Sequence, residues 1–223
     1  MSAQRSGVKT KRTYDTTSRS ERAGVSRSRT LEVARQRFLA NGYASTSVES
    51  IAAAARISPS TIYKSYGGKR GLARAVCEQA LAGVGPSAAE ERSNALRTLE
   101  DPHQVAAGWG DLVAEVAPRI APLLLVLRDA ARTDHEAAGL YDELDRTRLA
   151  RMADNARHLA QGGHLRSGVT AGEARDVMWM CSSPELYDLL VRRRRWSPGK
   201  FGRFVADTIT GVLIVPGIAT GER

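Results

Sequence analysis

The feature that most constrains the fold is helical periodicity, which runs through almost the whole chain from Ser28 onward. Ala, Leu, Arg and Glu dominate there, and no alternation of period two marks a strand. The best strand candidate, Thr208 to Val215, continues a helical pattern that begins near Pro198, so we expect helix there too. The sequence therefore predicts an all-α fold.

Positive charge is concentrated in the first third of the chain. Residues 1–75 carry 15 lysines and arginines against four acidic residues, a net charge of +11. The remaining 148 residues carry 18 basic and 20 acidic groups, a net charge of −2. Such asymmetry predicts a polyanion-binding module joined to a nearly neutral body. We favour nucleic acid as the polyanion, with an anionic membrane surface as the alternative.

Residues 1–27 differ from the rest in composition. They are rich in Ser, Thr, Arg, Lys and Gly and contain almost nothing to bury, so we predict a disordered basic arm. Such an arm could enter a minor groove beside the main DNA contact, or act only as a non-specific electrostatic tail. Its basic residues are Arg5, Lys9, Lys11, Arg12, Arg19, Arg22 and Arg27.

Composition argues against several other classes of protein. The longest apolar stretches fall far short of the ~18 residues that a membrane span needs, and the N-terminus lacks the apolar core of a secretory signal. Cys77 and Cys181 alone cannot form a disulfide framework or a cysteine metal cluster, and the four histidines show no paired metal-ligand spacing. No catalytic constellation stands out. We therefore expect a cytoplasmic protein that is not an enzyme, with no cofactor and no metal.

Four helices are expected in the basic region after the arm. The first runs from about Ser28 to Ala40, and the second from about Ser47 to Ala55. Thr46 and Glu49 have the spacing of a capping box at the start of the second helix. The apolar stripe of that helix is predicted to be Val48, Ile51, Ala52 and Ala55.

The third helix follows the second after a very short turn. Ser58 is its expected N-cap and Pro59 its first residue, where the missing N–H of proline costs nothing. It ends at about Ser65, and the fourth helix starts near Lys69. Because only about three residues separate the second and third helices, the two must cross steeply, as in a helix-turn-helix.

The third helix has the residues of a DNA-reading element. Ile57 and Ile62 are expected to anchor it in the core, which leaves small hydroxyls, a phenol and an ammonium facing outward. Within a segment of net charge +11, such a face suits the major groove. The outward residues are Ser60, Thr61, Tyr63 and Lys64.

The run from Ala34 to Leu72 resembles the tetracycline-repressor-type (TetR) family of bacterial transcriptional regulators. It contains an aromatic-x-x-x-Gly at 38–42, a Thr-Ser-Val-x-x-Ile-Ala at 46–52 and a Ser-x-x-Thr-Ile-Tyr at 58–63. Tyr66 and Lys69 follow at the family's spacing. Towards the C-terminus, Gly163 to Arg166 and the stretch from Gly172 to Phe201 are similar to the last two long helices of one TetR subgroup.

The resemblance implies both a fold and a function. The fold would have an N-terminal three-helix DNA-binding domain with a helix-turn-helix at 28–75, and a larger C-terminal helical domain for ligand binding and dimerisation at 76–223. The function would be that of a homodimeric, ligand-responsive repressor that binds a near-palindromic double-stranded DNA operator. Its effector would be an unknown small molecule, and no membrane would be involved.

The family also implies roles for individual residues at the DNA. The tyrosine that matches Tyr63 bonds a phosphate, and Lys69 would clamp a phosphate beside the N-terminal amides of its helix, with a merely solvated charge as the alternative. Arg56 stands where the family usually has glycine, and a left-handed backbone there would cost on the order of 1 kcal/mol. The predicted DNA contacts are Thr46, Ser47, Arg56, Ser58, Pro59, Ser60, Thr61, Tyr63, Lys64 and Lys69.

The larger domain of the family usually encloses an effector pocket, which directs attention to the big apolar side chains of the C-terminal region. Core packing alone explains most of them, but pockets are also apolar with a few polar anchors. Arg128, which follows an apolar stretch, is the predicted anchor for an acidic or polar effector group. The predicted pocket residues are Trp109, Leu112, Val116, Leu124, Arg128, Met152 and Met178.

The last helices are too apolar for a monomer surface. In the family, the matching helices pair across a two-fold axis as a four-helix bundle, so we expect a homodimer. The predicted interface residues are Trp179, Leu186, Leu190, Phe204, Ile209 and Val212. The basic run Arg192 to Arg195 is expected to be a solvated helix end.

Two other functions stay open from the sequence alone. One is an architectural protein that coats DNA without sequence preference. The other is a helical small-molecule-binding protein whose N-terminal region is purely structural.

Overall fold

The computed structural model describes residues 16–216, with side-chain burial from residue 24 onward. Within these residues the chain forms ten α-helices and a π-helical stretch, and no strand beyond one isolated bridge between Leu165 and Ile214. The predicted all-α fold is confirmed. The elements are α1 (Thr16–Asn41), α2 (Val48–Ala55), α3 (Pro59–Tyr66), α4 (Lys69–Ala82), α5 (Ala89–Leu96), α6 (Pro102–Ala130), α7 (His135–Gln161), α8 (Ala171–Cys181), α9 (Pro184–Tyr187), η1 (Asp188–Arg193) and α10 (Pro198–Leu213).

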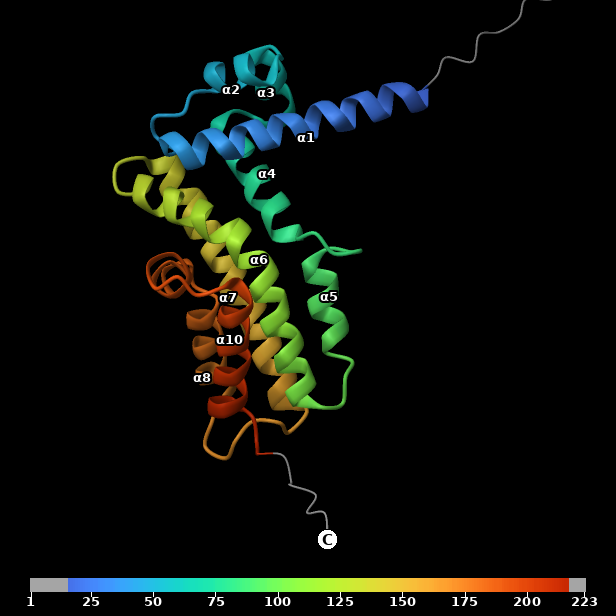
Figure 1. Ribbon diagram of the computed structural model, residues 1–223, viewed down its shortest axis with the longest axis vertical. Coiled ribbons are helices and arrows are strands. Elements are labelled where there is room, and N and C mark those ends of the chain that lie inside the picture. Colours follow the sequence, from blue (N-terminus) through green and yellow to red (C-terminus); the bar gives the residue numbers. More distant parts are fainter. Residues whose placement is uncertain (1–15, 217–223) are drawn as a thin grey trace, which may run out of the picture.

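The helices form two groups along the long axis of the molecule (Figure 1). α1 lies across one end of a bundle built from α6, α7, α8 and α10, with α2 and α3 beyond it. α4 leads from this end towards α5, which flanks α6. The boundary expected between the two domains, at residues 75 and 76, therefore falls inside α4.

α1 begins earlier than the sequence suggests. Residues 1–15 of the expected arm lie outside the described residues, but residues 16–27 form the first turns of α1, so a fully disordered arm is wrong for that part. The buried face of α1 starts only at Thr30 and Leu31, while residues 24–29 are exposed. Because residues 24–29 bury no apolar stripe, helix there could not be read from periodicity.

α2 has the predicted buried stripe but a different cap. Val48, Ile51, Ala52 and Ala55 are all buried. The N-cap is Ser47, whose Oγ accepts a hydrogen bond from the Ser50 amide at 3.1 Å. The predicted capping box of Thr46 with Glu49 is wrong, because Thr46 lies one residue before the cap and its hydroxyl donates to the carbonyl oxygen of Gly42 at 2.7 Å.

The turn between α2 and α3 is as tight as predicted. Arg56 caps α2 in the left-handed region, with φ 57° and ψ 45°. Ser58 caps α3, its Oγ accepts from the Thr61 amide at 3.3 Å, and Pro59 is the first helical residue. Gly67, at φ 74°, ends α3 with an amide that donates to the Tyr63 carbonyl.

Two apolar clusters hold the chain together. The first joins α1, α2, α3 and α4 to the adjacent ends of α6 and α7, so the N-terminal helices and the bundle share one core. The second fills the bundle between α6, α7, α8, α9 and α10. A displacement of α6 or α7 would thus reach α4 and α1 through packed side chains.

α6 and α10 pack most closely of all the helices. Gly110 of α6 and Gly202 of α10 face each other, and a Cβ built on Gly110 would lie 2.5 Å from the carbonyl oxygen of Gly202. Glycine is needed at both positions because the backbones approach too closely for any side chain.

Candidate nucleic-acid interface and ligand cavity

α3 presents a polar face to solvent and is anchored by a single buried residue. Ile62 is fully buried, and Ile57 in the preceding turn is half-buried against the same core. The side chain of Tyr63 is 53% exposed. The other side chains of this outward face are also exposed: Ser58, Pro59, Ser60, Thr61 and Lys64.

Three hydroxyls on the first turn of α3 form one hydrogen-bonded group. Ser58 Oγ lies 2.8 Å from both Ser60 Oγ and Thr61 Oγ1. These contacts hold the hydroxyls in fixed positions while they stay open to solvent. Each can donate or accept, so the group can pair with a base edge or a phosphate.

Lys69 ties the start of α4 to the loop after α1. Its ammonium donates to the carbonyl oxygen of Tyr43 at 3.3 Å and lies 4.3 Å from the centre of the Tyr43 ring. Tyr43 is itself buried and stacked on Phe38 at 5.6 Å between ring centres. Burial raises the pKa of Tyr43 to about 12. The side chain of Lys69 is half-buried, so it has a structural role whether or not it also meets a phosphate.

Thr46 cannot contact DNA as predicted. Its side chain is 2% exposed, and its hydroxyl lies 2.7 Å from the carbonyl oxygen of Gly42 and 3.2 Å from that of Arg37. The residue joins the end of α1 to the start of α2. Ser47 and Arg56, predicted beside it, are exposed at the two ends of α2.

One basic residue of the predicted arm lies near α3. Arg27 is exposed on α1, in the segment predicted to be disordered. Burial raises the pKa of Tyr66 at the end of α3, and the charge of Arg27 partly opposes this shift, which places the guanidinium close to α3. The missed signal was the continuation of α1 towards the N-terminus.

A cavity of about 440 Å³ opens among α5, α6, α7, α8 and α10. Its wall is mainly aliphatic, and α6 and α7 contribute most of the lining residues. Of the seven residues predicted for the effector pocket, six line this cavity: Trp109, Leu112, Val116, Leu124, Met152 and Met178.

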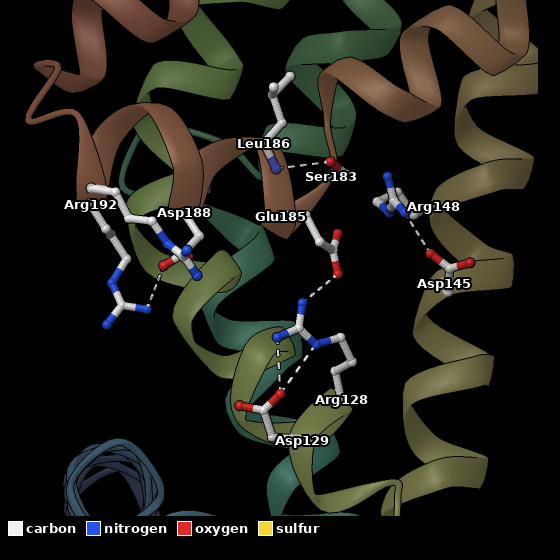
Figure 2. A network of polar contacts seen from close by, with 10 residues as sticks. Arg128, Asp129, Asp145, Arg148, Ser183, Glu185, Leu186, Asp188 and Arg192 are labelled. Carbon is white, nitrogen blue, oxygen red and sulfur yellow. Dashed lines mark hydrogen bonds and ion pairs between the residues drawn. The ribbon is translucent and has the colours of Figure 1, made fainter.

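Arg128 does not line the cavity, so its predicted role as an anchor there is wrong. Its guanidinium donates to Asp129 Oδ1 at 2.9 Å and to Glu185 Oε1 at 3.0 Å, and thereby joins the end of α6 to α9 (Figure 2). These two carboxylates hold the pKa of Arg128 above its usual value. In the apolar stretch before Arg128, Leu123 and Leu127 pack in the first core cluster, whereas Leu124 belongs to that cluster and also lines the cavity.

Polar residues that the sequence did not single out reach the cavity from α5 and α7. Asn155 is 3% exposed and Ser93 is 9% exposed. Four charged residues also line it, and Figure 2 shows one of them, Arg148, paired with Asp145. Their short or polar side chains carry no helical signature, so only the fold brings them together.

The predicted dimer residues divide into two groups. Ile209 is 3% exposed and lines the cavity, so it is part of this chain's own core, and its predicted place in the interface is wrong. The side chains of Trp179, Leu186, Leu190 and Phe204 are half-buried. Val212 is 50% exposed on α10, and two further large apolar side chains are exposed on α8 and η1, Met180 and Leu189.

The basic run near the C-terminus is solvent-exposed, as expected. Arg192 and Arg193 pair with Asp188 at 3.1 and 2.8 Å, and the run ends the π-helical stretch η1. The guanidiniums of Arg194 and Arg195 are exposed.

Two further searches of the described residues gave negative results. None of the helices there combines the length and hydrophobicity that crossing a bilayer requires. No group of three or more His, Cys, Asp or Glu side chains is arranged to hold a metal ion in the same part of the chain.

Comparison with known proteins identifies the family of the N-terminal helices. The family model for bacterial regulatory proteins of the tetR family matches residues 31–76. The chain carries the TetR-family N-terminal domain. No curated protein matches the chain by sequence. The matched segment covers residues 31–41 of α1 and all of α2 and α3, and it ends within α4.

Solved structures extend the likeness in fold over nearly the whole chain. The SmeT–triclosan complex is 19% identical with a TM-score of 0.68, over 89% of this chain and 99% of that one. SmeT, the repressor of the Stenotrophomonas maltophilia multidrug efflux pump SmeDEF, is 19% identical with a TM-score of 0.63, over 86% of this chain and 91% of that one. A regulator from Saccharomonospora viridis in complex with choline is 16% identical with a TM-score of 0.63, over 86% of this chain and 100% of that one. At these identities the likeness concerns the fold, which is that of TetR-family regulators.

Proposed function

We propose that this chain is a sequence-specific DNA-binding transcriptional regulator, a homodimeric repressor that a small molecule releases from its operator. The observation that carries the proposal is the outward face of α3. Ile62 is fully buried while Tyr63, Lys64 and the three hydroxyls of the first turn are exposed. A helix with this exposure, in a segment of net charge +11, can enter a major groove.

The bundle supports dimerisation. Val212 on α10 and Met180 on α8 leave large apolar surfaces open to water in the single chain. Pairing of these helices in two copies would cover them and would place two copies of α3 on one side of the dimer, as a near-palindromic operator needs.

The cavity supports regulation by a small molecule. It is lined by α6 and α7, whose ends share a core with α1 and α4. A ligand that binds better to one arrangement of these helices would shift the spacing of the two reading heads. SmeT, a repressor of similar fold, is solved with triclosan, and the Saccharomonospora viridis regulator with choline. Such a regulator would act in the cytoplasm, where the bacterial chromosome lies.

Selection of binding sites from a random double-stranded DNA library tests the proposal. The full chain should enrich a palindromic sequence, and fluorescence anisotropy should give an affinity for it about 1000-fold or more above that for scrambled DNA. Equal affinity for both would favour an architectural protein.

Two matched lysine variants locate the interface. Lys64→Ala on α3 should weaken binding to the selected sequence, because it removes an exposed cation from the reading face. Lys200→Ala removes the same charge from α10, where the ammonium lies over the Trp196 ring, and should leave binding unchanged. Equal binding by both variants and the wild type would contradict a DNA contact through α3.

A further inference from the structure

The charged groups at the cavity are already paired within the chain. Arg148 lies 2.6 Å from Asp145, and Arg151 contacts Glu90. A charged ligand that leaves water needs a free opposite charge, and each charged lining residue in the described chain already has a partner. The charged lining residues are Glu90, Arg148, Arg151 and Asp154, the last 2.8 Å from Arg157.

Aromatic faces do not supply a site for a cation either. Cations without a carboxylate partner are held by cages of several aromatic rings. Trp109 is the sole aromatic residue among those that line the cavity in the described chain. The ring of Trp179, close to the cavity wall through Arg148, is already covered by that guanidinium at 4.7 Å.

Two residues that line the cavity each carry a buried polar atom without a hydrogen-bond partner in the described chain, an acceptor on Asn155 and a donor on Trp109. Asn155 is 3% exposed and its Oδ1 accepts no hydrogen bond from the described residues; Trp109 is 5% exposed and its Nε1–H donates none to them. Burying an unpaired donor or acceptor is unfavourable, so both atoms would gain from a ligand.

Residue counts along the two helices put Trp109 and Asn155 at similar heights. α6 and α7 run antiparallel, joined by a short loop (Figure 1). Trp109 lies about two turns from the start of α6, and Asn155 about two turns from the end of α7. One small polar group between the two helices could therefore serve both.

We infer that the cavity takes an uncharged, largely apolar molecule that carries a hydroxyl group. The hydroxyl oxygen accepts from Trp109 Nε1–H, and the hydroxyl proton is donated to Asn155 Oδ1. A hydroxyl is both donor and acceptor, whereas a carboxylate can only accept and an ammonium can only donate. The inference rests on the proposed function, since it names the class of the proposed effector.

Four biphenyl compounds of one shape test the inference by isothermal titration calorimetry on the full chain at pH 7. They are 4-hydroxybiphenyl, biphenyl, biphenyl-4-carboxylate and biphenyl-4-ylmethylammonium. The hydroxyl compound should bind about tenfold or more tightly than each of the others, because they leave one or both polar atoms unpaired.

Variants of the two polar residues connect this preference to the cavity. Asn155→Leu removes its hydrogen-bonding group at nearly constant shape, and Trp109→Phe removes the indole N–H while it keeps an aromatic ring. Each should reduce the advantage of the hydroxyl compound over biphenyl to about threefold or less. Circular dichroism checks that both variants fold, and either one alone suffices for the comparison.

The outcomes separate this inference from the proposed function. Tighter binding of either ion than of the hydroxyl compound, no binding of any of the four, or an unchanged preference in a folded variant overturns the inference. If α3-dependent, sequence-specific DNA binding persists in that case, only the ligand class is wrong. If hydroxyl selectivity is found but DNA binding is not, the regulator proposal fails and the ligand class stands.

Discussion

The ammonium of Lys69 lies 3.3 Å from the carbonyl oxygen of Tyr43 and 4.3 Å from the centre of its ring. This contact spans 26 residues of sequence and fastens the start of α4 to the loop between α1 and α2. A lysine at a helix N-terminus opposes the helix dipole, so its position is explained by this partner and not by helix stability.

Lys69→Met should lower the free energy of unfolding by about 1 kcal/mol, because it keeps the apolar stem but removes the cation–π contact and the hydrogen bond. Urea denaturation measures the change. Lys200→Met is the matched control: its ammonium also lies over a ring, 4.2 Å from the centre of Trp196, but on an exposed surface. A larger loss of unfolding free energy in Lys200→Met than in Lys69→Met would contradict a stabilising contact between Lys69 and Tyr43.

Thr46 should matter for stability and not for DNA contact. Thr46→Val removes the hydroxyl that donates to Gly42 at nearly constant volume, so we expect a loss of about 1–2 kcal/mol in unfolding free energy. Thr46→Ser keeps the hydroxyl and should lose less. DNA affinity per folded molecule should stay close to that of the wild type in both variants, as measured by anisotropy below the unfolding transition.

Arg56 holds a left-handed backbone without being glycine. Its φ of 57° and ψ of 45° carry a cost that glycine does not have, so Arg56→Gly should raise the unfolding free energy by about 0.5–1 kcal/mol. Arg56→Ala removes the side chain but keeps the strain, and should show no such gain. If alanine stabilises as much as glycine, the guanidinium and not the backbone is the source of the cost.

The helix-turn-helix could be read from sequence because its signals are local. Ser58 and Pro59 start α3 as predicted, and the alternation of buried and exposed residues around Ile62 follows directly from helical spacing. The N-cap of α2 lies one residue later than predicted. Thr46 and Ser47 are both good N-cap residues, and only the fold shows that Thr46 is buried.

The rest of the site depends on contacts between distant segments. The cavity residues of α6 could be predicted because large apolar side chains must face either a core or a pocket. Periodicity could not tell whether Ile209 faces this chain's own core or a second copy. Nor could it pair Arg128 with Glu185, 57 residues away, or bring Asn155 opposite α6.

Acid should weaken the attachment of α5 to α6. Glu115 accepts two hydrogen bonds from Arg92, at 2.7 and 2.8 Å, and one from the Val84 amide, and these hold its pKa at about 2. Because the folded-state pKa lies below the unfolded value of 4.5, the stabilisation is present above pH 4.5 and is lost as the pH falls towards 2. Between these limits, the unfolding free energy of Glu115→Gln should depend less on pH than that of the wild type. Parallel curves would show that Glu115 is not the group responsible.

The link between α4 and α7 offers a test of communication through the shared core. Glu143 of α7 lies 2.5 Å from Arg74 and 3.4 Å from Arg70, both on α4. These side chains are more than a third exposed, so Glu143→Gln should change the unfolding free energy by less than about 1 kcal/mol.

Since these ion pairs join α7, which lines the cavity, to α4, which follows the proposed DNA-reading helix α3, the same variant should change the ratio of DNA affinities with and without a bound ligand. Asp142→Asn, an exposed neighbour, should leave that ratio unchanged. Equal ratios in the wild type and Glu143→Gln, measured by anisotropy with 4-hydroxybiphenyl as the ligand, would mean that coupling runs through the apolar core alone.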